Sequence, residues 1–108
     1  MNPRIESLEK MLNGPRDGAL LRYSLGNEYL KAGLPQPAAE HFRSAVERDA
    51  QYSAAWKALG KALAEAGEVT AAIAAYQSGI QVAEDRGDIQ AAKEMTVFAR
   101  RLQKTLKE

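Results

Sequence analysis

The sequence predicts an all-α protein built from stacked helix-turn-helix repeats. The segment LGNEYLKAG, which begins at Leu25, reappears 34 residues later as LGKALAEAG, which begins at Leu59. Within each copy apolar residues recur at helical spacing, and a glycine-led turn divides the copy into two blocks. These observations predict two units, each made of a first helix, a tight turn and a second helix.

The same offset aligns small and aromatic residues along the whole of each unit. A unit this short cannot bury its apolar face alone, so it gains a core by stacking on its neighbours. We therefore expect a first unit over residues 19–52 and a second over residues 53–86. The offset pairs Gly33 with Gly67, Ala38 with Ala72, Phe42 with Tyr76, Ser44 with Ser78, and Ala45 with Gly79.

This period and pattern resemble the tetratricopeptide repeat (TPR) family over residues 19–86. The resemblance implies a short right-handed superhelix, or α-solenoid, whose first helices line a concave groove. The sequence departs from the family pattern at Arg22, which replaces a tryptophan, and at Ala50 and Glu84, which replace a proline. The matching residues are Leu25, Gly26, Tyr29, Ala38, Phe42 and Ala45 in the first unit, and Trp56, Leu59, Gly60, Leu63, Ala72, Tyr76 and Gly79 in the second.

Gly26 and Gly60 lie in the middle of helical patterns, where glycine costs about 1 kcal/mol relative to alanine. Because both occur at the same phase, close approach of a neighbouring helix explains them better than a kink does. Phe42 and Tyr76 are expected to fill the space beside them. We expect leucine at position 60 to disrupt this packing and alanine to be tolerated.

Each end of the stack is expected to carry a helix that covers the repeats. At the N-terminus a short amphipathic stripe is followed by the stop signal Asn13-Gly14-Pro15. Residues 1–18 are therefore expected to form a short helix and a linker. The stripe consists of Ile5, Leu8, Met11 and Leu12.

Residues 87–108 are expected to form a C-terminal capping helix that begins after Asp88 as its N-cap. At the 34-residue phase this helix places Lys93 and Glu94 where the repeats have Leu-Gly. Its apolar side should face the stack and its charged side should face water. The apolar side consists of Ala91, Ala92, Met95, Phe98 and Leu102, and the charged side of Lys93, Glu94, Arg100, Arg101 and Lys104.

The charge is nearly balanced, with 15 basic and 14 acidic residues and a net charge of +1. This composition lacks the basic excess of a nucleic-acid-binding protein. No apolar run approaches the roughly 20 residues that span a bilayer, and the N-terminus mixes both charge signs, unlike a secretory signal. We expect a cytoplasmic protein that binds neither nucleic acid nor membrane.

Residues suited to catalysis or metal binding are few. His41 is the one histidine, it lies on a second helix, and there is no cysteine. A Ser-His-Asp arrangement would depend on this single imidazole, and a zinc site needs three or four ligands. The pair Gly60-Lys61 lies inside a helix, where backbone amides are already bonded and cannot cradle phosphate. We expect no catalytic residue, no metal and no cofactor.

The resemblance to the TPR family implies a non-enzymatic adaptor or scaffold whose groove binds another protein or a peptide, acidic or C-terminal. Only Asn27 matches the residues with which some members grip chaperone C-termini. Two alternatives remain: homo-oligomerisation that extends the stack, and a merely solvated face at the two groove lysines. The candidate groove residues are Tyr23, Asn27, Lys31, Lys57, Lys61, Met95 and Phe98.

Overall fold

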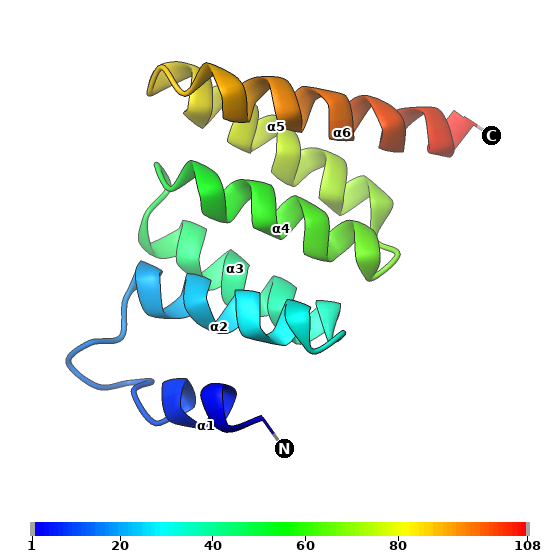
Figure 1. Cartoon of the computed structure of the whole chain (residues 1–108). Coiled ribbons are helices and arrows are strands. Elements are labelled where there is room, and N and C mark those ends of the chain that lie inside the picture. Colours follow the sequence, from blue (N-terminus) through cyan, green and yellow to red (C-terminus); the bar gives the residue numbers. More distant parts are fainter. Residues whose placement is uncertain (1, 108) are drawn as a thin grey trace.

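The computed structural model describes residues 2–107, which form six helices and no strand. The all-α helical-repeat fold predicted from the sequence is therefore confirmed. The helices are α1 (Pro3–Glu9), α2 (Ala19–Lys31), α3 (Pro35–Arg48), α4 (Ser53–Glu65), α5 (Val69–Asp85) and α6 (Ile89–Lys107) (Figure 1).

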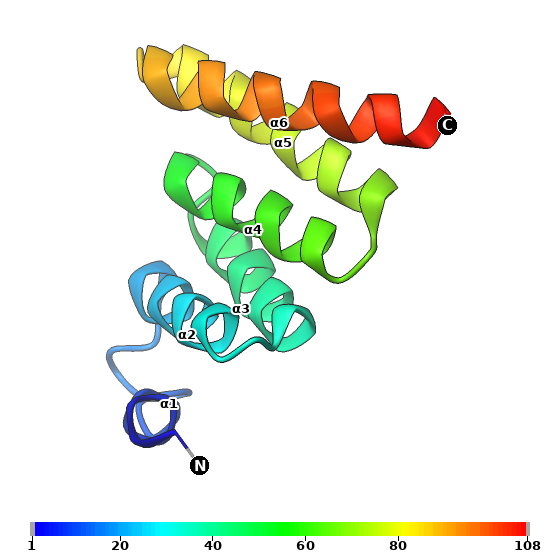
Figure 2. The same cartoon turned by 45° about the vertical axis from the view of Figure 1, so that its right-hand side comes forward.

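The helices stack in chain order from α1 at one end to α6 at the other (Figure 1). α2 packs on α3, α3 on α4, α4 on α5, and α5 on α6. Figures 1 and 2 show α2, α4 and α6 in one layer and α3 and α5 in the layer behind it. The molecule measures 41 × 30 × 18 Å, and the layer of α2, α4 and α6 forms one of its faces (Figure 1).

Three helices end in the same glycine turn. Gly33, Gly67 and Gly87 have φ values of 78°, 81° and 76°, in the left-handed region that favours glycine. In each turn the residue after the glycine donates its amide back into the helix, as Asp88 N does to Ala83 O at 2.8 Å. The turn closes α2, α4 and α5 and sends the chain back along the helix it has just left.

The interior glycines lie directly under aromatic rings. A β-carbon on Gly26 would lie 2.5 Å from Cε1 of Phe42, and one on Gly60 would lie 2.5 Å from Cε1 of Tyr76. Both rings are buried, Phe42 completely. The glycines therefore serve close packing. The expectation that alanine is tolerated is wrong, because the β-carbon itself would force the ring to move.

The N-terminal helix is shorter than the apolar stripe that predicted it. The Asn2 side chain caps α1 by accepting hydrogen bonds from the amides of Arg4 and Ile5, at 2.9 and 3.2 Å. α1 ends at Glu9, so Met11 and Leu12 lie in the turns that follow it. The stripe still covers the stack, because Ile5 forms a buried cluster with Leu21 and Leu25, and the other three residues of the stripe pack against this cluster.

The C-terminal helix is shifted by two residues from the 34-residue phase. α5 is three residues longer than α3, and the turn after it is one residue shorter than the turn after α3. α6 therefore begins 36 residues after α4. Met95, which is fully buried, takes the place of Leu59, whereas Lys93 is exposed. The predicted division into a packing side and a charged side is confirmed for all residues except Glu94, which is half-buried.

Candidate peptide-binding groove

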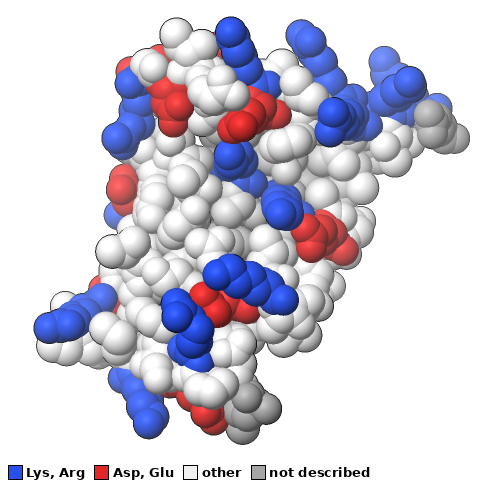
Figure 3. Space-filling model, in the orientation of Figure 1, with Lys and Arg blue, Asp and Glu red and all other residues white. Residues whose placement is uncertain are grey.

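The candidate site lies on the face formed by α2, α4 and α6, here called the first-helix face. Tyr23 and Lys57 occupy equivalent places on α2 and α4, one helical turn before Asn27 and Lys61. The four side chains thus form two short rows across the face. Figure 3 shows basic side chains spread over this face, with acidic side chains beside several of them.

Tyr23 forms part of the wall of this face. Its ring centroid lies 4.9 Å from that of Tyr52, which precedes α4, and 5.8 Å from that of Phe42. These contacts leave Tyr23 half-buried, so its ring is held in place by the core on one side. The aromatic pair links α2 to the start of α4 and gives the groove a rigid apolar edge.

Lys57 and Lys61 differ in their surroundings. Lys57 Nζ lies 2.9 Å from Glu94 Oε1 and bridges α4 to α6, with about two-fifths of each side chain exposed. The hydrogen bond and the charge of Lys57 lower the pKa of Glu94. Lys61 is exposed and forms no ion pair with any residue in the described range 2–107. Lys61 is therefore the cation of this pair that can receive an anionic group directly.

Lys31 lies at the end of the groove beside a buried acid. Its Nζ is 3.6 Å from Glu28 Oε2, and Arg4 Nε lies 3.3 Å from the same oxygen. Glu28 is 7 % exposed, whereas Lys31 and Arg4 are mostly exposed. This cluster could not be predicted from the sequence, because Arg4 comes from α1 and meets Glu28 only in the folded chain. Lys31 remains accessible at the rim, with part of its charge already compensated.

Met95 lies in the core, whereas Phe98 is partly accessible. Met95 is fully buried, and a β-carbon on Gly79 would lie 2.5 Å from its sulfur, so Met95 fills the space beside that glycine. Phe98 is half-buried, with its ring centroid 5.7 Å from that of Tyr76. The prediction of Met95 as a groove contact is therefore wrong, and that of Phe98 stays a prediction.

The two-residue shift brings other side chains to the groove positions of α6. Lys93 takes the place that Lys57 has on α4, and Val97 takes that of Lys61. Both are exposed. Gly87 is the signal in the sequence that could have found them. It marks the end of α5, which lies three residues beyond the position equivalent to the end of α3.

His41 lies away from this face, on α3. Its ring stacks on Tyr29 with centroids 5.4 Å apart, and its buried Nδ1 has no hydrogen-bond partner among the described residues. Burial lowers the pKa of His41, so the imidazole is neutral near pH 7. Over residues 2–107 no group of three or more His, Asp or Glu side chains is placed to hold a metal ion. Nor does any helix in that range have the length and apolar character to cross a membrane.

The family model for the tetratricopeptide repeat matches residues 23–89, from the middle of α2 to the first residue of α6. The chain belongs to the TPR family. Its resemblance to that family, inferred from the 34-residue period, is thereby confirmed. TPR domains generally mediate protein–protein interactions, and TPR proteins are generally non-enzymatic scaffolds.

Relatives of this TPR chain match it over nearly its whole length. A TPR repeat-containing protein of Pseudomonas aeruginosa is 53% identical over 98 residues, which cover 91% of this chain and 93% of the relative. The solution structure of a protein from Bordetella parapertussis is 42% identical, with a TM-score of 0.80 and coverage of 97% and 91% of the two chains. A TPR domain protein from Salinibacter ruber is 29% identical, with a TM-score of 0.73 and coverage of 83% and 90%.

Proposed function

We propose that this TPR chain is a non-enzymatic adaptor that captures an acidic peptide segment of another protein on its first-helix face. The observation that carries the proposal is Lys61, an exposed cation without an ion-pair partner among residues 2–107. It takes the place in the second repeat that Asn27 takes in the first. An unneutralised cation on an open face attracts carboxylates and speeds their encounter.

The neighbouring side chains supply the other contacts that an extended peptide needs. The amide of Asn27 both donates and accepts hydrogen bonds, so it can bind a peptide backbone. Tyr23, fixed between Phe42 and Tyr52, offers apolar surface that loses little side-chain entropy on binding. Lys57 contributes less than Lys61, because an incoming carboxylate has to compete with Glu94.

Fluorescence anisotropy with labelled peptides of equal length tests this function. The panel contains an acidic peptide with a free C-terminus, the same peptide amidated, a neutral peptide and a basic one. We expect the acidic peptides to bind, with an affinity that falls as salt rises. Lys61→Glu should weaken binding about tenfold, and Tyr23→Ala should weaken it at every salt concentration.

The matched control is Arg43→Glu, a charge reversal at an exposed position on α3 in the other layer. It should leave peptide affinity unchanged. If Arg43→Glu abolishes binding while Lys61→Glu and Tyr23→Ala have no effect, the binding surface is the second-helix layer and the groove proposal fails.

Self-association is the alternative function, and one observation favours it. Ile89 and Val97 of α6 are 63% and 44% exposed and lie near each other at the end of the stack. Stable dimers usually bury a larger apolar surface than two side chains supply. We therefore expect a monomer at micromolar concentration in sedimentation velocity, and a dimer that persists on dilution would favour self-association.

A further inference from the structure

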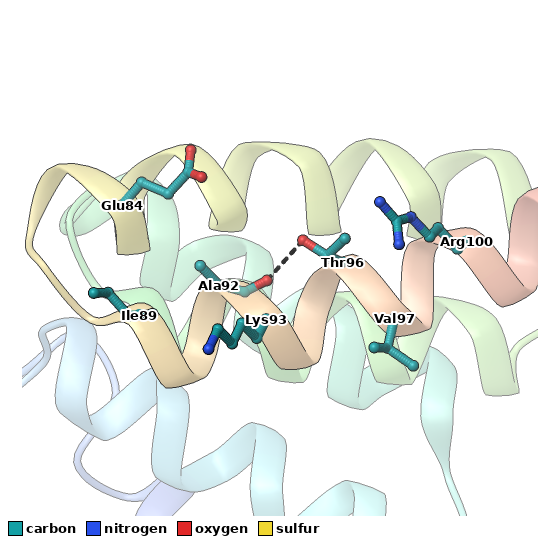
Figure 4. Close-up of a pocket in the computed structure, with 7 residues that line it drawn as sticks. All are labelled: Glu84, Ile89, Ala92, Lys93, Thr96, Val97 and Arg100. Carbon is teal, nitrogen blue, oxygen red and sulfur yellow. Dashed lines mark hydrogen bonds between the residues drawn. The ribbon is translucent and has the colours of Figure 1, made fainter.

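In each repeat the second helix covers one face of the first helix: α3 covers α2, and α5 covers α4. The corresponding face of α6 is here called its outer face. On α4, Gly60 lies under Tyr76 of α5, and the β-carbon of Trp56, one turn earlier, packs at Gly79 of α5. The two-residue shift places Ala92 and Thr96 at the corresponding positions of α6. Thr96 is half-buried, whereas Ala92 is buried at the edge of the core cluster, and both line a hollow of about 480 Å³ (Figure 4).

This hollow is more apolar at its rim than the matching faces of the two repeats. Ile89 and Val97, both exposed, line it on the α6 side. Large aliphatic side chains at both positions are therefore specific to the uncovered helix. The corresponding residues are Ala19 and Asn27 on α2, and Ser53 and Lys61 on α4.

The charge around the hollow is mainly positive. Lys93 and Arg100 line it, and Glu84 of α5 is its one acidic lining residue. The exposed charges further along α6, up to Lys107, are also basic. The occupant that complements this surface has an apolar face bordered by acidic residues.

A second copy of this chain does not fit as well. In a two-fold antiparallel pairing of α6 centred on Thr96 and Val97, Lys93 of one copy would meet Arg100 of the other. Like charges brought together in this way oppose association. The charge pattern therefore favours a different, acidic partner over a homodimer.

We propose that the outer face of α6 is a second docking site, which binds an acidic amphipathic helix of a partner protein in the place that α3 and α5 take on α2 and α4. The apolar side of that helix covers Ile89 and Val97, and its acidic flanks meet Lys93 and Arg100. This site accepts a helix, whereas the groove accepts an extended segment, and the two sites adjoin at Lys93 and Val97.

Thr96 sets the size of the partner residue that lies over it. Glycine at the equivalent position of α4 lets an aromatic ring approach to a distance that a β-carbon would forbid. Thr96 has that β-carbon, and its hydroxyl already donates to Ala92 O at 2.8 Å (Figure 4). The partner helix therefore carries a small residue at this point.

A designed helix tests the site in the full chain. The probe is a labelled peptide with the α5 sequence, Val69–Asp85, that carries Tyr76→Ala for the small contact and Gln77→Glu and Gln81→Glu for acidic flanks. There are two control peptides. The first keeps Tyr76 but carries both glutamates, and the second carries Tyr76→Ala but has lysine in place of each introduced glutamate. We expect saturable binding of the probe in fluorescence anisotropy, and binding at least about fivefold weaker for each control.

Variants of the protein locate the bound helix. Lys93→Glu with Arg100→Glu should weaken probe binding about tenfold, and Val97→Asp should weaken it about fivefold. Lys104→Glu, on the same helix outside the hollow, and Lys61→Glu, in the groove, should change it less than about twofold. All five positions are exposed, so we expect each variant to keep the fold, which circular dichroism checks.

Several outcomes would overturn the proposal. The first is that the probe does not bind saturably, and the second is that the lysine control binds as tightly as the probe. The third is that Lys61→Glu loses as much affinity as Lys93→Glu with Arg100→Glu. A dimer in sedimentation that Val97→Asp dissociates would assign the face to a second copy. Co-sedimentation with phosphatidylserine vesicles that the same charge reversals abolish would assign it to a membrane surface.

Discussion

The α2–α3 pair and the α4–α5 pair pack alike at their centres. In each pair an aromatic ring, from Phe42 or Tyr76, lies on a glycine of the first helix, and a β-carbon on either Gly26 or Gly60 would be 2.5 Å from that ring. Both glycines and both rings are buried. Only a glycine under a ring satisfies that geometry, so both pairs use the same residues there.

The two pairs differ where the first helix begins. Trp56 Nε1 donates a 2.9 Å hydrogen bond to Ala50 O, in the loop before α4. Arg22 takes the equivalent place on α2 and donates from Nε and Nη2 to both oxygens of Asp17, at 2.9 and 2.8 Å. Asp17 also accepts from the amide of Asn13. An indole or an ion pair can therefore perform the same task, which is to tie the helix to the preceding loop.

The largest expected effect comes from leucine at the two central glycines. Gly26→Leu and Gly60→Leu each force a side chain into a buried ring, and each should lower the free energy of unfolding by about 3 kcal/mol or more. Urea denaturation measures the loss. Gly18→Leu is the control, because nothing lies within 4 Å of a β-carbon there and its backbone is extended. An unchanged midpoint for either central variant would contradict the shared packing of the two pairs.

Alanine at the same positions should destabilise the two helix pairs to different extents. The ring of Phe42 is fully buried, whereas Tyr76 packs on Phe98, which is half-buried and can shift. We expect Gly26→Ala to cost about 2 kcal/mol and Gly60→Ala about 1 kcal/mol, after the helix propensity of alanine has offset part of the clash. Equal losses in urea denaturation would mean that both rings are confined to the same degree.

The sequence predicted features that repeat and missed those that depend on one irregular length. The glycine–aromatic pairs were visible because they recur at a fixed offset of 34 residues. The longer α5 breaks that offset, which moved Met95 into the core and Val97 to the surface. Ion pairs between elements, such as Lys57 with Glu94, were also invisible, because nothing in the local pattern fixes which charges meet across helices.

Low pH should remove the stability that the ion pair of Asp17 with Arg22 gives to the start of α2, while the hydrogen bond of Trp56 at the start of α4 does not titrate. Arg22, the Asn13 amide and Arg48 together hold the pKa of Asp17 below its ordinary value of 3.8. A carboxylate with a lowered pKa contributes stability that is present above its ordinary value and is lost as pH falls through the folded value. We expect the melting temperature of the wild type to exceed that of Asp17→Asn at pH 7, and the difference to shrink as pH falls below 4.

The double variant Arg22→Trp with Asp17→Asn sharpens this test, because it gives the first pair the indole of the second pair. Arg22→Trp alone leaves Asp17 without its main partner and should be less stable than the double variant at pH 7. If the single and double variants melt at the same temperature at every pH, the ion pair does not tie α2 to its loop.

The smallest expected effects are on the groove side, where the first pair presents Tyr23 and Asn27 and the second presents Lys57 and Lys61. Lys57→Glu removes the bridge to Glu94 and places two carboxylates together. It should lower stability by about 0.5–1 kcal/mol, a small loss because both side chains are partly exposed and the charges are screened by solvent. Lys61→Glu should change stability by less than about 0.5 kcal/mol.

The loss of peptide affinity should be larger for Lys61→Glu than for Lys57→Glu, the opposite of the order for stability. Lys61 is free to meet a peptide carboxylate, whereas Lys57 is already paired with Glu94. Urea denaturation and peptide anisotropy on the same samples separate the two effects. Exchange of the charges, in Lys57→Glu with Glu94→Lys, should restore the lost stability and leave most of the peptide affinity. A stability loss in Lys61→Glu as large as that in Lys57→Glu would mean that Lys61 also supports the fold, and its weaker binding would no longer point to direct contact with the peptide.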